Sequence, residues 1–184
     1  MLGGTYHVAA RGNCGQDIFR DGRDREAFLA RFDRCVARYR LVCLAYCLMT
    51  NHFHLVLKNP EGGLSSGMQM LISGHSREMN QRYGRRDHLF KQHFASKRIT
   101  REAHLLEACR YVVLNPVRAG LCRSPAGWKW SSYRACAGFA FAPNFLATGE
   151  LLGIFASRPG VAAARYCEFV ASAHDAVSDT LTLR

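Results

Sequence analysis

A hairpin of two apolar strands is the feature that most constrains the fold of this chain. Residues 41–48 (LVCLAYCL) form a continuous apolar run, which is typical of a central strand buried on both faces. After only Met49, Thr50 and Asn51, a second strand pattern follows at residues 52–58 (HFHLVLK). So short a link predicts an antiparallel pair. A sheet with so apolar a centre needs helices to cover it.

Strand and helix patterns surround this hairpin. The expected order is strand, helix, strand, strand, helix, strand and helix, over residues 5–11, 24–39, 41–48, 52–58, 64–83, 88–99 and 101–114. This order predicts an α+β fold, in which helices pack against an antiparallel sheet. Thr100 is expected to cap the last helix. Pro116 is expected to end it near Leu114, because proline disfavours a helical residue before it.

The chain length and the last third of the sequence define the expected domains. The 184 residues suffice for one compact domain with a small extension. Apolar helical patches without a chemical motif lie in the last third, so we predict one domain over residues 1–135 and a short helical extension over residues 136–184. The last ten residues are expected to be loose.

Charge and cysteine usage restrict the partners and the compartment. Lys and Arg total 25 against 14 Asp and Glu, and a net charge of +11 attracts polyanions, of which nucleic acid is the commonest. The eight cysteines contain no C-x-x-C pair, which argues against a structural zinc site and favours a reducing compartment. No signal sequence or membrane-spanning run is recognisable. We therefore expect a cytoplasmic protein that has no membrane partner.

The first chemical motif is His52-Phe53-His54. On a strand, residues two apart point to the same face, so both imidazoles can reach one metal ion while Phe53 points into a core. Imidazole suits zinc, manganese or nickel, and two ligands leave positions open for oxygen atoms. The alternative is a chance pair of histidines on a half-exposed strand.

The second motif lies in residues 110–116 (RYVVLNP). Helical spacing places Tyr111 opposite the apolar stripe of its helix. Packing in the core does not explain an aromatic side chain on that face, so a functional role is indicated. Asn115 follows four residues later on nearly the same face, so its amide oxygen could complete a metal site. The alternative is that Asn115 only forms a turn before Pro116.

Taken together and in this order, the motifs resemble those of the single-tyrosine HUH transposases, and most closely the REP-associated tyrosine transposases. The resemblance is carried by residues 6–8 (YHV), 11–13 (RGN), 46–54 (YCLMTNHFH), 88–91 (HLFK), 110–120 (RYVVLNPVRAG) and 130–133 (WSSY). It covers about residues 5–135 and implies a ferredoxin-like HUH domain. The chain departs from the pattern at Gln92-His93, where an arginine is missing, and at His75, where a tyrosine is usual.

The resemblance implies a role for four residues. The metal-binding pair falls on His52 and His54, the nucleophile on Tyr111, and the third, amide-type ligand on Asn115. The implied cofactor is a divalent metal ion, magnesium or manganese. The implied activity is that of a transposase-like nuclease and strand transferase for single-stranded, hairpin-forming (REP-type) DNA, which acts through a covalent 5′-phosphotyrosine intermediate. The absence of a G-x-x-x-x-G-K-[ST] loop agrees with a reaction that needs no ATP.

The DNA itself is expected to contact mainly basic residues. Phosphate contacts position DNA without specifying its sequence, and His88 and Phe90 could stack on unpaired bases. The candidates for DNA contact are Arg11, Asn13, Arg77, Arg85, Arg86, His88, Phe90, Lys91, Lys97, Arg110 and Arg118. For any one of them, the alternative is an ordinary surface residue.

Other functions remain open at this point. The main alternative is a catalytically inactive repeat-DNA-binding protein with the same fold. An RNA-recognition module would need more exposed aromatic residues on its central strands. A hydrolase with a water nucleophile would need a carboxylate near His52 and His54, and only Glu61 follows them. A cytoplasmic, nucleoid-associated monomer or homodimer is expected.

Overall fold

The central sheet contains four antiparallel strands. The computed structural model describes residues 3–91 and 94–172, so Met1-Leu2, Gln92-His93 and residues 173–184, with the ten expected to be loose, lie outside the described residues. The strands run in the order β2-β3-β1-β4, and all three neighbouring pairs are antiparallel. Their bounds are Thr5–Arg11 for β1, Val42–Leu48 for β2, His52–Lys58 for β3 and Ala95–Ile99 for β4. The predicted hairpin and the α+β class are confirmed.

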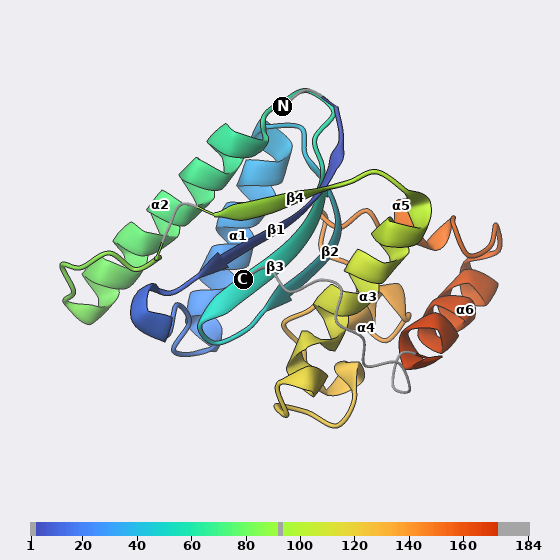
Figure 1. The fold of residues 1–184 in the computed structure, drawn as a ribbon. Helices are drawn as coiled ribbons and strands as arrows, with labels where there is room; N and C mark the ends of the chain where they lie inside the picture. The colour runs from blue at the N-terminus through green and yellow to red at the C-terminus, as the bar shows by residue number, and fades with distance from the viewer. Residues whose placement is uncertain (1–2, 92–93, 173–184) are drawn as a thin grey trace.

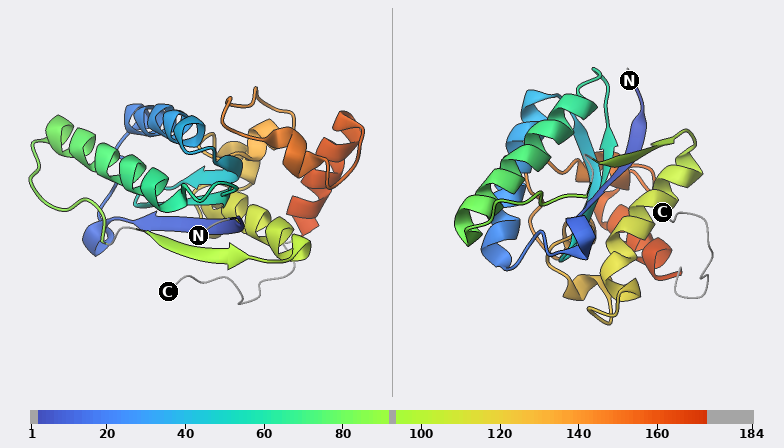
Figure 2. Two further views of the ribbon diagram at one scale, coloured as in Figure 1. Left: turned by 90° about the horizontal axis from the view of Figure 1, so that it is seen from above. Right: turned by 60° about the vertical axis from the view of Figure 1, so that its left-hand side comes forward.

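Three long helices cover the two faces of the sheet. Helices α1 (Gly22–Arg38) and α2 (Leu64–Tyr83) lie on one face, and α3 (Glu102–Arg118) lies on the other (Figures 1 and 2). Phe53 is fully buried on the α1 side, where its ring centroid lies 5.0 Å from that of Phe28. Strand alternation therefore turns the two neighbouring histidines of β3 toward α3.

Helix α3 differs from its prediction at both ends. It begins at Glu102 with Arg101 as its N-cap, so the prediction that Thr100 caps it was wrong. It also continues through Pro116 to Arg118, one turn beyond the expected end. Leu114 and Pro116 are both buried, so apolar contacts of this turn outweigh the local preference against a helical residue before proline.

The C-terminal third covers the outer edge of β2. Its elements are η2 (Pro125–Gly127), α4 (Tyr133–Cys136), α5 (Thr148–Leu152) and α6 (Pro159–Ala171). Ser131 and Leu146 form single bridges to β2, and the Tyr166 ring of α6 is buried in the common core. The predicted boundary between residues 135 and 136 falls inside α4, and an independent extension stays a prediction. No helix within the described residues is long and apolar enough to cross a membrane.

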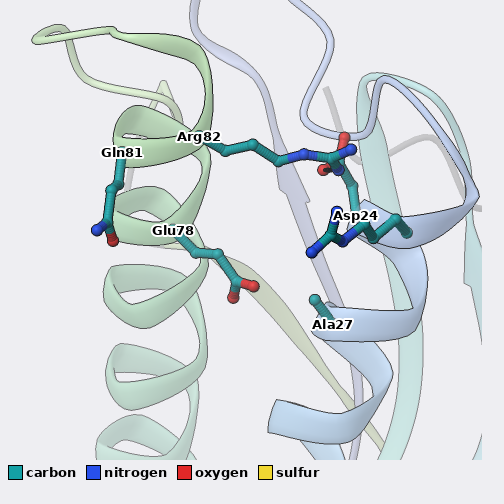
Figure 3. A pocket seen from close by; sticks show the side chains of 6 residues that line it. Asp24, Ala27, Glu78, Gln81 and Arg82 are labelled. Atoms are coloured by element: carbon teal, nitrogen blue, oxygen red, sulfur yellow. Dashed lines mark hydrogen bonds and ion pairs between the residues drawn. The ribbon is translucent and has the colours of Figure 1, made fainter.

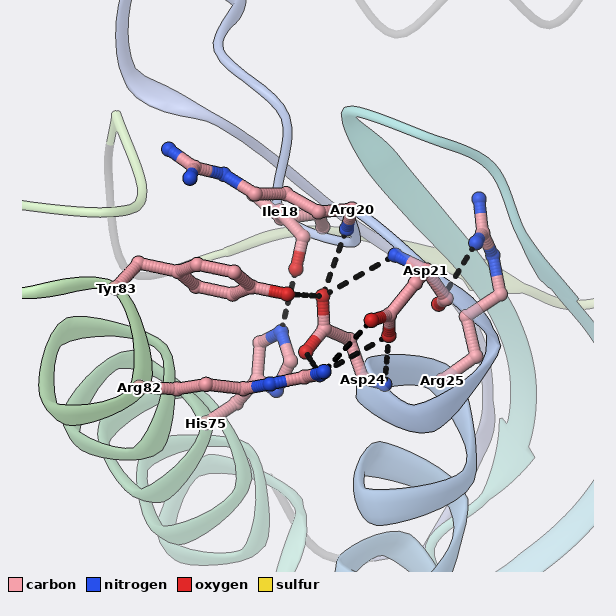
Figure 4. Close-up of polar contacts among 8 residues, drawn as sticks. All are labelled: Ile18, Arg20, Asp21, Asp24, Arg25, His75, Arg82 and Tyr83. Atoms are coloured by element: carbon pink, nitrogen blue, oxygen red, sulfur yellow. Dashed lines mark hydrogen bonds and ion pairs between the residues drawn. The ribbon is translucent and has the colours of Figure 1, made fainter.

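A buried carboxylate joins the start of α1 to the end of α2 (Figure 4). Asp24 accepts hydrogen bonds from the Tyr83 hydroxyl at 2.9 Å and from the Arg20 amide at 2.8 Å, and it pairs with Arg82. Asp21 forms a capping box with Asp24, which satisfies amide groups in the first turn of α1. The side chain of Asp24 is only 2% exposed, against 46% for Asp21.

His75 has a structural place on the same side of the sheet. Its ring is buried between Phe19 and Phe28, at centroid distances of 5.0 and 5.1 Å. Its Nε2 donates a hydrogen bond to the Ile18 carbonyl oxygen at 2.7 Å. The histidine that stands in place of the usual tyrosine is therefore a core residue that fixes the segment before α1.

We predict that Asp24→Ala destabilises the protein by about 3 kcal/mol, because several partly buried donors would lose their buried acceptor. Asp21→Ala should cost clearly less, since its side chain is half exposed and water can replace it. Urea unfolding followed by circular dichroism measures both. Equal losses for the two variants would contradict a special role for the buried carboxylate.

Candidate active site

Three histidines from two neighbouring strands meet on the face of the sheet that α3 covers. In the β1–β3 register Ala9 lies opposite His54, so His7, two residues earlier, points to the same face. The Nε2 atom of His7 lies 3.0 Å from the Nδ1 atom of His54. The ring centroids of His52 and His54 are 5.1 Å apart. The strand pairing therefore builds a compact imidazole cluster.

Tyr111 of α3 approaches this cluster from above the sheet. Its ring centroid lies 5.7 Å from that of His7 and 5.6 Å from that of His54, both in edge-on geometry. Apolar residues on the adjoining face of α3, among them Cys109 and Val112, are buried in the core and hold the helix against the sheet. The half-buried phenol thus faces the histidines.

Asn115 follows one turn after Tyr111. Its Nδ2 atom donates a hydrogen bond to the Tyr111 carbonyl oxygen at 2.9 Å. This bond occupies the nitrogen end of the amide and leaves the Oδ1 oxygen available to a ligand.

A second amide fixes the orientation of His52. The Asn51 Nδ2 atom donates to the Gly15 carbonyl oxygen at 3.1 Å, and the Asn51 Oδ1 atom lies 2.7 Å from the Nδ1 atom of His52. Gly15 belongs to the short helix η1 (Asn13–Gly15), which follows β1. Gly12 must be glycine there, because a Cβ atom would lie 2.0 Å from the Gln16 carbonyl oxygen.

The three histidines are neutral at physiological pH. Burial, and then the charge of Lys97, lowers the pKa of His7 to about 4. Burial, and then the charge of Arg11, lowers the pKa of His52 to about 4. Burial and the two neighbouring histidines hold the pKa of His54 well below its ordinary value. Neutral imidazole is the form that binds metal ions.

The residues present fit a divalent metal ion. His52 and His54 offer imidazole nitrogens, and Asn115 offers an amide oxygen. No three His, Cys, Asp or Glu side chains among residues 3–91 and 94–172 form a complete metal-binding group. An ion at this site would therefore combine two imidazoles with oxygen ligands, a mixture that suits manganese.

Several of the predicted DNA-binding residues surround the histidines. Lys97 lies opposite His7 in the β1–β4 pairing, so both point to the same face. The Arg118 guanidinium lies 5.0 Å from the centroid of the Tyr111 ring. Arg11 lies opposite His52 in the β1–β3 pairing. The remaining candidates are exposed or half-buried polar residues; they are Arg86, His88 and Lys91, which are exposed, and Asn13, which is half-buried.

Four other predicted DNA-binding residues are buried, bound to another side chain, or far from Tyr111. Phe90 is 8% exposed and packs in the core against Phe53. Arg110 binds both carboxylate oxygens of Glu107 at 2.7 Å. Arg85 contacts the side chain of Gln16.

Arg77 belongs to the opposite face of the molecule. It lines a hollow between α1 and α2 together with Arg31 and Arg34. This hollow adjoins a pocket of about 250 Å³ in which Glu78 and Arg82 of α2 face Asp24 of α1 (Figure 3). Arg77 is therefore separated from Tyr111 by the sheet.

The sequence alone predicts no role for two residues of the site, His7 and Asn51. Both lie within sequence motifs shared with the HUH transposases, and strand alternation puts His7 on the same face as Arg11. Only the pairing register shows that His7 lies beside His54, and only the chain path shows that Asn51 touches Gly15.

The four-stranded antiparallel sheet carries a tyrosine that faces strand-borne histidines, and comparison with known proteins identifies the family of the chain. The family model described as "Transposase IS200 like" matches residues 2–115, and the chain belongs to this family. The solved structure of a REP-associated tyrosine transposase bound to a REP hairpin has a similar fold, with a TM-score of 0.66 and 15% sequence identity over 80% of this chain and 87% of that one. None of the curated proteins compared with the chain matches it.

We predict that acid destabilises the fold through these histidines. The pKa of His7 falls from 6.5 in the unfolded chain to about 4 in the fold, so the unfolded state binds more protons and stability decreases as the pH falls below the unfolded value. This group alone should cost about 2 kcal/mol between about pH 7 and about pH 5. Urea unfolding at both pH values measures it. In His7→Leu the acid-induced loss should be smaller by that amount, and parallel curves would contradict the assignment.

Proposed function

We propose that this chain cleaves and rejoins single-stranded DNA with Tyr111 as its nucleophile. The observation that carries the proposal is the contact of the Tyr111 ring with the His7–His54 pair. A core tyrosine would need no imidazole neighbours, and a purely structural histidine pair would need no half-exposed phenol beside it. Membership in a transposase family supports DNA as the substrate.

The reaction is a transfer of a phosphoryl group to the phenol. The Tyr111 oxygen forms a bond to phosphorus, the bond to the 3′ oxygen breaks, and the DNA is left with a 5′-phosphotyrosine link and a free 3′-OH. The phenol gives up one proton and the leaving oxygen gains one. Attack by a 3′-OH on the tyrosine ester reverses these steps and joins two strands, so the energy of the phosphodiester is retained.

The neighbouring residues prepare this step. His52, His54 and Asn115 would hold a magnesium or manganese ion, which supplies Lewis-acid stabilisation of the charge that develops on the phosphate. Helix α3 fixes the phenol above the histidines through its buried face. Arg118, beside the Tyr111 ring, and Lys97, opposite His7, would neutralise the phosphates that flank the scissile bond.

The proposed substrate is a hairpin-forming repeat presented as single-stranded DNA. The net charge of +11 suits a polyanion, and the similar solved structure holds a REP hairpin. The protein would act in the cytoplasm on nucleoid DNA, as a monomer or as a homodimer. A catalytically inactive protein that binds the same repeats is the second candidate, because its surface would be the same.

We predict that Tyr111→Phe abolishes a covalent DNA adduct while DNA binding remains. Wild type and variant are incubated with single-stranded hairpins from the repeats of the source genome, with Mn²⁺ or Mg²⁺, and run on a denaturing gel. Only the wild type should give a slow band of DNA joined to protein, because the variant lacks the oxygen that attacks phosphorus. A chelator should remove the band.

The controls separate the alternatives. A gel-shift assay under native conditions should give equal affinity for wild type and Tyr111→Phe. Binding by wild type without an adduct, with both metals and several hairpins, would favour the inactive binder. Cleavage that persists in Tyr111→Phe would mean that water is the nucleophile.

We also predict that Arg118→Ala weakens DNA binding through the loss of one phosphate contact. The slope of log affinity against log salt concentration should fall by about 0.7, the value for one contact to a single strand. Arg40→Ala is the matched control, because Arg40 is exposed, contacts Glu61 and precedes the opposite end of the β2–β3 hairpin. Equal slopes for wild type and Arg118→Ala would remove Arg118 from the DNA surface.

A further inference from the structure

The two proposed metal-binding histidines differ in what their Nδ1 atoms contact. For His52 the neighbour is an amide oxygen whose orientation is fixed, since the nitrogen of Asn51 already donates to Gly15. An oxygen can only accept, so His52 carries its proton on Nδ1. Its Nε2 atom therefore has a free lone pair, and this ring is ready to bind a metal ion.

The neighbour of His54 is a second imidazole, which can donate or accept. The His7 Nε2 atom and the His54 Nδ1 atom share one hydrogen bond of 3.0 Å. Two arrangements of protons satisfy it, and in each both rings are neutral. Either His7 donates and His54 keeps its proton on Nε2, or His54 donates and His7 keeps its proton on Nδ1.

The surroundings of His7 distinguish these arrangements. His7 is 1% exposed, and its Nδ1 atom is buried without a hydrogen-bond partner in the part of the chain that the structure describes. A buried N–H group without an acceptor is rarer in proteins than an unused acceptor. The favoured arrangement is therefore the one in which His7 donates from Nε2 and leaves Nδ1 without a proton.

We propose that His7 and His54 form a coupled tautomer pair, in which His7 holds His54 in the form that cannot bind metal until an ion displaces the proton. The inference rests on the proposed function, because it takes His54 as a metal ligand. When His54 binds through Nε2, the proton on that atom passes to solvent, and the proton between the rings moves from His7 Nε2 to His54 Nδ1. His7 takes up one proton from solvent at Nδ1, so the pair holds two protons in both states.

His7 is thus a positioning residue that makes the two ligands unequal. His52 is set for metal by Asn51, whereas binding at His54 requires an unpaired N–H on His7. A partner that only accepts a hydrogen bond would remove this penalty. Methionine at position 7 offers a sulfur acceptor without a proton, and leucine offers similar volume without an acceptor.

The first test is nitrogen NMR of the histidine rings in the metal-free protein. In wild type we expect the proton of His52 on Nδ1 and the proton of His54 on Nε2. In His7→Met the proton of His54 should move to Nδ1. Zn²⁺, a diamagnetic ion that imidazole binds well, should produce the same move in wild type. A metal-free wild type with the His54 proton on Nδ1 would overturn the proposal.

The second test is Mn²⁺ affinity, measured by electron paramagnetic resonance of the free ion. His7→Leu should bind about as tightly as wild type, because each metal-bound state leaves one buried N–H group without an acceptor. His7→Met should bind about tenfold more tightly than either, because its sulfur accepts the His54 Nδ1 proton and leaves no N–H group unpaired. Equal affinity in the two variants would mean that His7 only fills space, and it would overturn the tautomer pair.

Two controls complete the design. His75→Leu removes another buried, hydrogen-bonded histidine on the other side of the sheet, and it should leave Mn²⁺ affinity unchanged while it lowers stability. Thermal unfolding of each variant shows that it is folded. Failure of the proposed function is recognised separately, because the absence of a Tyr111 adduct leaves the tautomers of the metal-free protein unaffected.

Discussion

The antiparallel pairing of β1 with β3 is the interaction on which the site depends. Its register places Ala9 opposite His54 and brings His7 within hydrogen-bond distance of that ring. A shift by one residue would turn every side chain of β1 to the other face. His7 would then enter the core beside α1, and Val8 would meet the histidines. The same ladder that stabilises the sheet therefore also sets the geometry of the imidazole cluster.

Helix α3 contributes the other half of the site because it is amphipathic. Its buried apolar face contacts the sheet, and the edge next to that face carries Tyr111 and Asn115. The helical continuation through Pro116 is what keeps Asn115 in register with Tyr111, one turn away. Because the phenol is held by a packed helix and not by a loop, its distance to the histidines is fixed before DNA arrives.

The sequence predicted the parts of this molecule that follow from local periodicity. Alternation in residues 52–58 correctly separated Phe53 from its two neighbouring histidines, and the short link correctly predicted the hairpin. The predictions for Thr100 and Pro116 failed because tertiary packing of α3 overrode local preference. Phe90 was expected to face DNA, and its burial depends on contacts with distant residues. The role of His7 depends on strand register, which one sequence does not reveal.

The cover over the outer edge of β2 has a consequence for solubility. An uncovered strand edge presents unpaired backbone groups to any other chain and promotes aggregation. Here the Ala147 amide donates to the Cys43 carbonyl oxygen at 2.8 Å and the Leu48 amide donates to the Trp130 carbonyl oxygen at 2.9 Å, so the edge is occupied near both ends. The C-terminal third therefore protects the edge of the sheet. A chain that ends before Leu146 would leave part of the apolar strand β2 uncovered, and this edge could pair with another copy of the chain.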